Sequence, residues 1–234
     1  QFDDRKKVME KKWNKGKYIA YFQAYTNTYA PIEELREKYS QAIAEENVVA
    51  LSIATRPDCL GDDVLELLEE MSKKELGLQT INDETAENFN RGYKFEVFKE
   101  GIKKLQDRGI EVVVHSIFGL PGETKEDMLK TIDYIAHSGA QGIKFHLLHL
   151  MKYTKMAEQY YNGEFELLSE EDYIDLICEG ISMIPEDMVV HRLTGDAPRA
   201  TLIGPMWSLK KWEVLNAIDK ALVDRDIWQG KNFN

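Results

Sequence analysis

Short apolar runs alternate with longer charged segments along most of this chain. The charged segments carry apolar residues at helical spacing and predict helices at 2–14, 32–45, 62–72, 94–108, 124–138, 169–183 and 210–224. The apolar runs predict strands at Tyr18–Phe22, Val48–Ala54, Glu75–Gln79, Ile110–Ser116, Gly142–Leu148 and Met188–Arg192. Because regular strand–helix alternation is typical of a parallel sheet, we predict one α/β domain, in which only Met151–Leu168 follows neither pattern.

The two faces of the predicted strands differ in character. Side chains alternate across a strand, so within Gly142–Leu148 the polar Lys144 and His146 lie opposite the bulky Ile143. The run Glu75–Gln79 is divided in the same way. Helices on both sides of a sheet would require two apolar faces, whereas one polar face suits a lumen that holds a ligand. The pattern therefore predicts an open or partial βα barrel, with a doubly wound sheet as the alternative.

Composition narrows the classes of protein that fit this pattern. The 234 residues include 30 Lys and Arg against 41 Asp and Glu, which gives a net charge of −11. Clustered cations hold nucleic-acid backbones, so this charge argues against that as the main role and leaves nucleic-acid binding open. No run approaches the ~18 apolar residues of a membrane span, and the charged N-terminal region is unlike a secretory signal. We predict a cytoplasmic protein with no membrane partner.

Cysteine is scarce in this chain. Cys59 and Cys178 are its two cysteines, which excludes a disulfide scaffold and any cluster or zinc site that takes three or four thiolates from these residues. Each is expected to pack as a buried apolar side chain. His146 and His149 have opposite strand parity and are not expected to chelate one ion, so we predict no metal site within this chain.

The segments that follow the strands are richer in polar and turn-forming residues than packing requires. Residues 23–31 form a small hydroxylic loop before a helix, which suits a carboxylate or phosphate or is a plain turn. Arg56 can clamp an anion or pair with Asp58. Residues 118–124 hold two glycines and a proline, which let the backbone turn tightly past a ligand.

Polar side chains on the lumen face are candidates for chemistry, because a buried carboxylate or amide is costly unless it is paired or used. Glu75 suits ribose hydroxyls, and Gln79 suits a base, a ribose or a carboxylate. An ion pair between Glu75 and Lys144 is the purely structural alternative. Lumen parity, strand-end position and polarity select five substrate-side candidates, namely Arg56, Glu75, Lys144, His146 and Arg192.

Seven segments together resemble a known superfamily. They are Tyr18–Pro31, Leu51–Leu60, Glu75–Asn82, His115–Thr124, Gly142–Leu150, His191–Pro198 and Ile203–Lys211. Over nearly its whole length the chain resembles the radical S-adenosylmethionine (SAM) superfamily, and most of all its YhcC/YtqA-type members. Weaker similarity extends to the radical domain of the Elongator catalytic subunit and to oxygen-independent coproporphyrinogen oxidase.

The resemblance implies a set of cofactors and a reaction. A partial (β/α)6 TIM-like barrel would hold a [4Fe–4S] cluster on three cysteines, with SAM on the open iron of the cluster. Reductive cleavage of SAM would give a 5′-deoxyadenosyl radical that abstracts hydrogen from a substrate, so an electron donor is an expected partner. Matched by position, Ala24, Tyr25 and Thr26 would meet the methionine amino group, Gln79 the ribose or carboxylate, Arg91 the carboxylate and His115 the ribose.

The chain departs from the family in two places. Relatives often carry an acidic residue at the position of Ala54, and Glu75 is a candidate to replace its polar role. The family's loop of three cysteines is absent, and residues 1–16 resemble the helix that follows that loop. We therefore expect residues 1–234 to be an incomplete core domain that lacks the first strand, with the cluster ligands upstream of Gln1 and with 188–234 as an extension that closes the barrel.

Three functions follow from these observations. The leading hypothesis is a radical SAM enzyme, inactive as this chain alone because the cluster cysteines are missing. The second is a cluster-free module that binds SAM or another small ligand on the same fold. The third is an unrelated barrel hydrolase or metalloenzyme. The expected substrate is an RNA nucleotide or a small metabolite, and the net charge of −11 argues against a large RNA.

Overall fold

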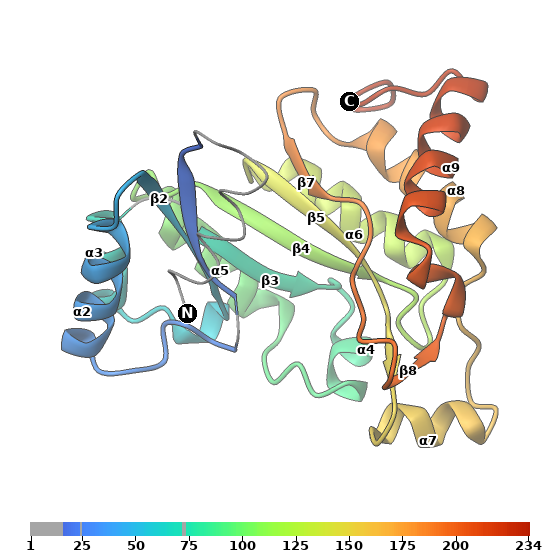
Figure 1. Cartoon of the computed structure of the whole chain (residues 1–234), viewed down its shortest axis with the longest axis horizontal. Coiled ribbons are helices and arrows are strands. Elements are labelled where there is room, and N and C mark those ends of the chain that lie inside the picture. Colours follow the sequence, from blue (N-terminus) through green and yellow to red (C-terminus); the bar gives the residue numbers. More distant parts are fainter. Residues whose placement is uncertain (1–15, 24, 72–73) are drawn as a thin grey trace.

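A parallel sheet of six strands organises the molecule, as the computed structural model of the chain shows (Figure 1). The structure describes residues 16–23, 25–71 and 74–234, and the side chains of Lys74 and Glu75 lie outside this description. The strands are β1 (Tyr18–Phe22), β2 (Val48–Thr55), β3 (Lys74–Gln79), β4 (Val112–Phe118), β5 (Gly142–Leu147) and β7 (Val189–Arg192). They follow one another in the order β1-β2-β3-β4-β5-β7, and every neighbouring pair is parallel.

This strand order decides between the two predicted architectures. A doubly wound sheet reverses its order at a switch point, whereas the order here follows the chain without reversal. The sheet also curls, because Lys144 of β5 lies with its Nζ 3.2 Å from the phenol oxygen of Tyr21 on β1, although three strands separate β1 from β5. The partial-barrel prediction is confirmed, and the doubly wound alternative is excluded.

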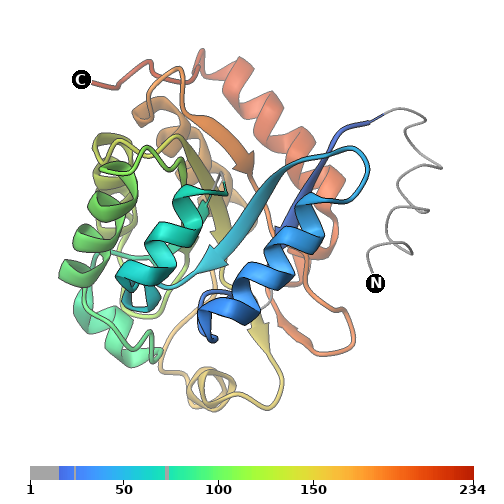
Figure 2. The same ribbon diagram turned by 90° about the vertical axis from the view of Figure 1, so that its left-hand side faces the viewer.

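The helices are α2 (Ile32–Ile43), α3 (Asp62–Glu69), α4 (Asp83–Asn88), α5 (Phe95–Gln106), α6 (Lys125–His137), α7 (Lys155–Tyr161), α8 (Glu170–Met183) and α9 (Lys211–Asp224), with short 3-10 turns at Pro57–Cys59 and Met206–Leu209. Most of them cover the outer face of the curled sheet (Figure 2), whereas α7 lies apart from the sheet (Figure 1). Two short strands, β6 (Leu150–Met151) and β8 (Leu202–Gly204), pair separately and antiparallel. No helix in the described ranges is long and apolar enough to cross a membrane.

The predicted helices and strands differ from the observed ones mainly where elements are short. The elements α4, α7, β6 and β8 were not predicted, because hydrophobic periodicity needs a longer window than their few residues provide. The irregular stretch Met151–Leu168 contains α7. The helix predicted at 2–14 lies outside the described residues.

The main core lies between the outer face of the sheet and the helices. Helix α5 buries Phe98, Ile102 and Leu105, which recur at the spacing of one helix face. Each such side chain contributes roughly 1.5–3 kcal/mol by leaving water. On β4 the helix-facing Val114 is fully buried, whereas its neighbour His115 is only half-buried and faces the lumen. The predicted division between an apolar outer face and a more polar inner face is therefore confirmed.

Candidate functional site

The lumen face gathers polar side chains from strands that are distant in sequence. The rings of His115 on β4 and His146 on β5 lie 5.0 Å apart at an angle of 31°. Lys144 is buried, with its Nζ 4.5 Å from the centre of the Tyr21 ring. Arg192 pairs with Lys144 in the register of β5 and β7, so both residues share this face. Four sequence-predicted residues therefore lie on one inner surface.

Glu75, the other lumen candidate, lies in register with Ala54 on β2 and Val113 on β4. This backbone position belongs to the lumen face, while its side chain lies outside the described part of the structure. Arg56 lies instead beyond the end of β2, where its Nε and Nη2 donate to the two carboxylate oxygens of Asp58 at 2.9 and 2.7 Å. The pairing alternative for Arg56 is the one that the structure shows.

Gln79 lies at an irregularity where β3 ends. The register with β4 shifts between Gly77 and Gln79, and Gln79 has a left-handed backbone with φ of 64°. Its amide folds back over Gly77, because a Cβ on that glycine would lie only 2.6 Å from Nε2. Simple strand alternation does not describe this geometry, yet the amide still lies on the lumen side of the strand end.

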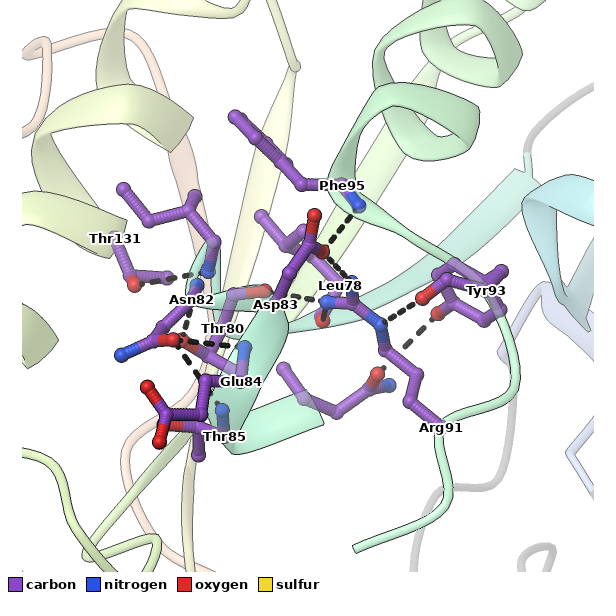
Figure 3. Close-up of polar contacts among 12 residues, drawn as sticks. Leu78, Thr80, Asn82, Asp83, Glu84, Thr85, Arg91, Tyr93, Phe95 and Thr131 are labelled. Carbon is purple, nitrogen blue, oxygen red and sulfur yellow. Dashed lines mark hydrogen bonds and ion pairs between the residues drawn. The ribbon is translucent and has the colours of Figure 1, made fainter. Parts of the chain in front are cut away.

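Arg91 clamps the backbone on both sides of Gln79 (Figure 3). Its Nη1 donates to the carbonyl oxygens of Leu78 and Thr80 at 3.0 and 2.5 Å. Its Nε donates to the Tyr93 carbonyl at 2.9 Å, and its Nη2 donates to the Asp83 carboxylate at 2.9 Å. By binding the carbonyls of residues 78 and 80, Arg91 therefore fixes the unusual turn at Gln79.

The Arg91 side chain is only 2% exposed, and burial lowers its pKa. Each of its three nitrogen atoms already donates to an acceptor of the protein. The resemblance assigns Arg91 to a ligand carboxylate, whereas the geometry gives it a structural role at the strand end. A contact with a ligand would have to be made in addition to this network.

Tyr93 completes the support of the Gln79 turn. Its hydroxyl donates to the Gly77 carbonyl at 2.7 Å and lies 3.3 Å from Oε1 of Gln79. Burial raises the pKa of Tyr93 to about 12, so the hydroxyl keeps its proton at neutral pH. The guanidinium groups of Arg91 and Arg56 lie 4.7 and 5.1 Å from the centre of its ring, within the range of cation–π attraction. Sequence reasoning missed Tyr93, because only the fold brings it to Gln79.

The loop after β1 is held in place through Asn27. Its Nδ2 donates to the carbonyls of Phe22 and Ala54 at 2.9 and 3.0 Å, which joins the ends of β1 and β2. Tyr25 precedes it with a left-handed φ of 63° and a side chain that is 97% exposed, and Thr26 is half-buried. The loop is therefore fixed, with Tyr25 exposed and Thr26 half-buried at the mouth of the barrel. Ala24 lies outside the described residues.

Glu123 is a further titratable group at this mouth, in the glycine-rich turn after β4. Its carboxylate accepts a hydrogen bond from the hydroxyl of Thr80, the residue that follows Gln79. Burial raises the pKa of Glu123 to about 7, and the Thr80 hydrogen bond offsets part of that rise. The turn was predicted to pass close to a ligand, and the link to β3 could not be read from sequence because residues 80 and 123 are far apart.

A cavity of about 360 Å³ opens where β4 and β5 end. Apolar side chains line most of it, with amides and one histidine among them; its lining includes Phe89, Ile117, Leu148, Met156, Asn88, Asn90, Gln159 and His149. Among the described residues, no carboxylate lines it and Lys155 is its one cation. A neighbouring cavity of about 220 Å³ shares Asn88, Phe89, Met156 and Gln159. Both were missed from sequence, since α4 and α7 form their walls.

The two cysteines do not form a metal site. Cys59 is half-buried beside β2 and Cys178 is buried in α8, and burial raises the pKa of both thiols. Within the described ranges, no group of three or more His, Cys, Asp or Glu side chains is arranged to hold a metal ion. These residues therefore do not fit a [4Fe–4S] cluster, which needs thiolates from several cysteines.

Comparison with known proteins identifies relatives over the whole chain. The profile of the radical SAM superfamily matches residues 2–135, and that of a radical SAM C-terminal domain matches residues 140–224. The uncharacterised protein YtqA of Bacillus subtilis is 51% identical over 100% of this chain and 74% of its own length. Protein YhcC of Escherichia coli is 37% identical over 90% of this chain and 70% of its own length.

Solved structures show the same fold at lower identity. Elp3 of Methanocaldococcus infernus, with an N-terminal deletion, matches with a TM-score of 0.76 and 20% identity, over 89% of this chain and 54% of its own. The coproporphyrinogen III oxidase HemN of Escherichia coli, a radical SAM enzyme, matches with a TM-score of 0.52 and 21% identity, over 67% of this chain and 37% of its own. These likenesses support the partial-barrel fold.

Proposed function

Because the chain belongs to the radical SAM superfamily, we propose that the mouth of its barrel binds SAM for radical chemistry on a substrate held in the lumen. One observation carries this proposal: a cavity of about 360 Å³ with apolar walls and amide groups adjoins the lumen surface at the C-terminal ends of the strands. In barrels of parallel strands, this end holds the active site.

The side chains at the mouth match the parts of SAM in chemical character. Adenine is flat and uncharged, so it suits the cavity wall of Ile117 and Leu148 and its amides. The ribose suits the Gln79 amide and His115 on the neighbouring lumen face. The methionine end suits the loop at Tyr25 and Thr26. In this arrangement Arg91 holds the backbone at Gln79 in place by donating to the carbonyls of residues 78 and 80.

The cluster is a separate part of the proposal. These 234 residues hold two cysteines, one in the turn after β2 and one in α8, and they do not fit a cluster. We infer that the ligands come from outside this chain, and that the chain alone binds SAM without cleaving it. A cluster-free binding module is the second candidate, favoured by the lack of a three-thiolate site.

Calorimetric titration of the chain with SAM tests the first part. We expect saturable binding, weakened about tenfold or more by Gln79→Ala, because one polar contact to the ribose or carboxylate is lost. Gln41→Ala is the matched control, since Gln41 is exposed on α2, where its amide donates to the Glu37 carboxylate. Absence of SAM binding, or equal affinity in both variants, would contradict the proposal.

Iron and sulfide analysis separates the two candidates. The complete gene product, reconstituted without oxygen, is expected to take up iron and sulfide and to cleave SAM when reduced. A complete product that binds SAM and takes up no iron would favour the cluster-free module. The substrate is proposed to be a small metabolite, in keeping with the net charge of −11. An RNA nucleotide is the other candidate. A more distant relative of this chain, a protein of Methanocaldococcus jannaschii, is named tRNA uridine(34) acetyltransferase.

A further inference from the structure

The segments after β5 and β7 pack directly against each other at the mouth of the barrel. His149 lies two residues beyond β5, and Gly195 lies three residues beyond β7. A Cβ on Gly195 would lie 2.6 Å from Cε1 of the His149 ring, so only a glycine fits there without displacement. The segment after β7 then runs on to β8, which pairs with β6 (Figure 1). This corner lies on the far side of β5 from the Gln79 turn.

Two polar atoms in this corner are buried without a hydrogen bond. Within the described part of the chain, Nε2 of His149 and Oγ1 of Thr194 have no partner, and Thr194 is only 2% exposed. An unsatisfied buried polar group costs roughly 1–3 kcal/mol. Native proteins rarely keep such groups unless water, an ion or a ligand forms a hydrogen bond with them. Two such groups on adjacent segments therefore mark a place where a hydrogen-bonding partner is accommodated.

The charged groups of the corner leave one cation loosely engaged. Arg192 ends β7 on the lumen face, its side chain is 33% exposed, and its Nη2 lies 3.8 Å from Asp196. Asp196 already accepts from Nζ of Lys211 on both carboxylate oxygens at 3.0 Å. The charge of the Asp196 carboxylate is thus balanced by Lys211, and the Arg192 guanidinium remains available to a second anion.

The chemistry of these groups selects the class of ligand. Arg192 can only donate hydrogen bonds, and the Thr194 hydroxyl can donate one. Burial lowers the pKa of His149, so its ring is neutral and offers one N–H. We propose that Arg192, Thr194 and His149 form a site for an oxyanion of the substrate, a carboxylate or a phosphate group. The identification of this anion as the substrate's rests on the proposed radical chemistry, and the site itself does not.

Calorimetric titration of the 234-residue chain with inorganic phosphate and with acetate, at constant ionic strength, tests the site and distinguishes the two anions. We expect one of them to bind saturably and Arg192→Gln to weaken that binding about tenfold. Arg199→Gln is the matched control, because Arg199 is an exposed arginine of the same segment. Binding that does not saturate, or that falls equally in both variants, means an adventitious ion only and overturns the proposal.

Thr194→Val supplies a variant that is expected to fold. Its hydroxyl has no partner to lose, so thermal stability should stay the same or rise, while anion affinity falls severalfold. Unchanged anion affinity in this variant would contradict the role of Thr194.

Titration with SAM then separates this inference from the proposed function. We expect Arg192→Gln to leave SAM affinity unchanged. A parallel loss of SAM affinity would show that the anion is the carboxylate of SAM itself, and the substrate assignment would be wrong. Anion binding by a wild-type chain that fails to bind SAM would leave the oxyanion site standing and overturn the proposed function.

Discussion

Replacing Arg91 by alanine is expected to destabilise the fold more than it affects any ligand contact directly. The substitution leaves the carbonyls of Thr80 and Tyr93 without the donors that they have in the described structure, while the Leu78 carbonyl keeps the Thr80 amide at 2.8 Å. A buried polar group left unsatisfied costs about 1–3 kcal/mol, so two such carbonyls cost about 4 kcal/mol together. That is a large part of the stability of an ordinary domain.

Urea unfolding followed by circular dichroism measures this loss. Arg91→Lys should fall between the wild type and Arg91→Ala, because one ammonium group cannot span the acceptors that the planar guanidinium reaches. Arg36→Ala is the control, since Arg36 makes an exposed ion pair with Glu70 and its loss should change stability far less. A loss below about 1 kcal/mol for Arg91→Ala, accompanied by a large fall in SAM affinity, would refute the reasoning and restore Arg91 as a ligand-binding residue.

Two further predictions concern the same strand end. Because the pKa of Glu123 rises from 4.5 to about 7 on folding, its ionisation opposes folding, and stability should fall as pH rises from about 4.5 through 7. Glu123→Gln should remove up to about 2 kcal/mol of that fall, after allowance for partial exposure, and an unchanged pH dependence of urea unfolding would contradict this. Gly77→Ala should displace the Gln79 amide and weaken SAM binding in calorimetry. Gly16→Ala is the control and should leave SAM binding unchanged, because its Cβ would meet no atom of the described residues within 4 Å. Equal affinities of the two variants would argue against the folded-back amide.

The sheet could be predicted from sequence because its determinants are periodic and local. Each of the six predicted strands is observed, and the division of Ile143 from Lys144 across β5 follows from alternation alone. Arg192 was selected as a polar residue at the end of a predicted strand, and the register with Lys144 puts it on the inner face. Periodicity extends over whole elements, so a few irregular residues do not hide it.

The candidate site was harder to predict because its contacts join residues far apart in the chain. Gln79 could be singled out by its amide, whereas its left-handed turn depends on Arg91 and Tyr93 more than ten residues later. Arg56 was predicted either to bind an anion or to pair with Asp58. The structure shows the pair with Asp58, which sequence alone did not distinguish from the alternative. The cavity depends on α4 and α7, which are too short for periodicity to reveal.

The two sides of the barrel mouth differ in how fully their hydrogen bonds are met. At the end of β3, the carbonyls of residues 77, 78 and 80 all accept from Arg91 or Tyr93, so Gln79 is fixed before any ligand binds. At the ends of β5 and β7, His149 and Thr194 keep buried polar atoms without partners among the described residues. A site that always binds the same molecule gains affinity from side chains that are already fixed, because little conformational entropy is then lost when the ligand binds. A buried polar group that gains its hydrogen-bond partner only from the ligand destabilises the unbound protein. A ligand that supplies this partner therefore binds more tightly than one that does not. In the proposed arrangement, the fixed side therefore suits the ribose of SAM, and the unsatisfied side suits the substrate.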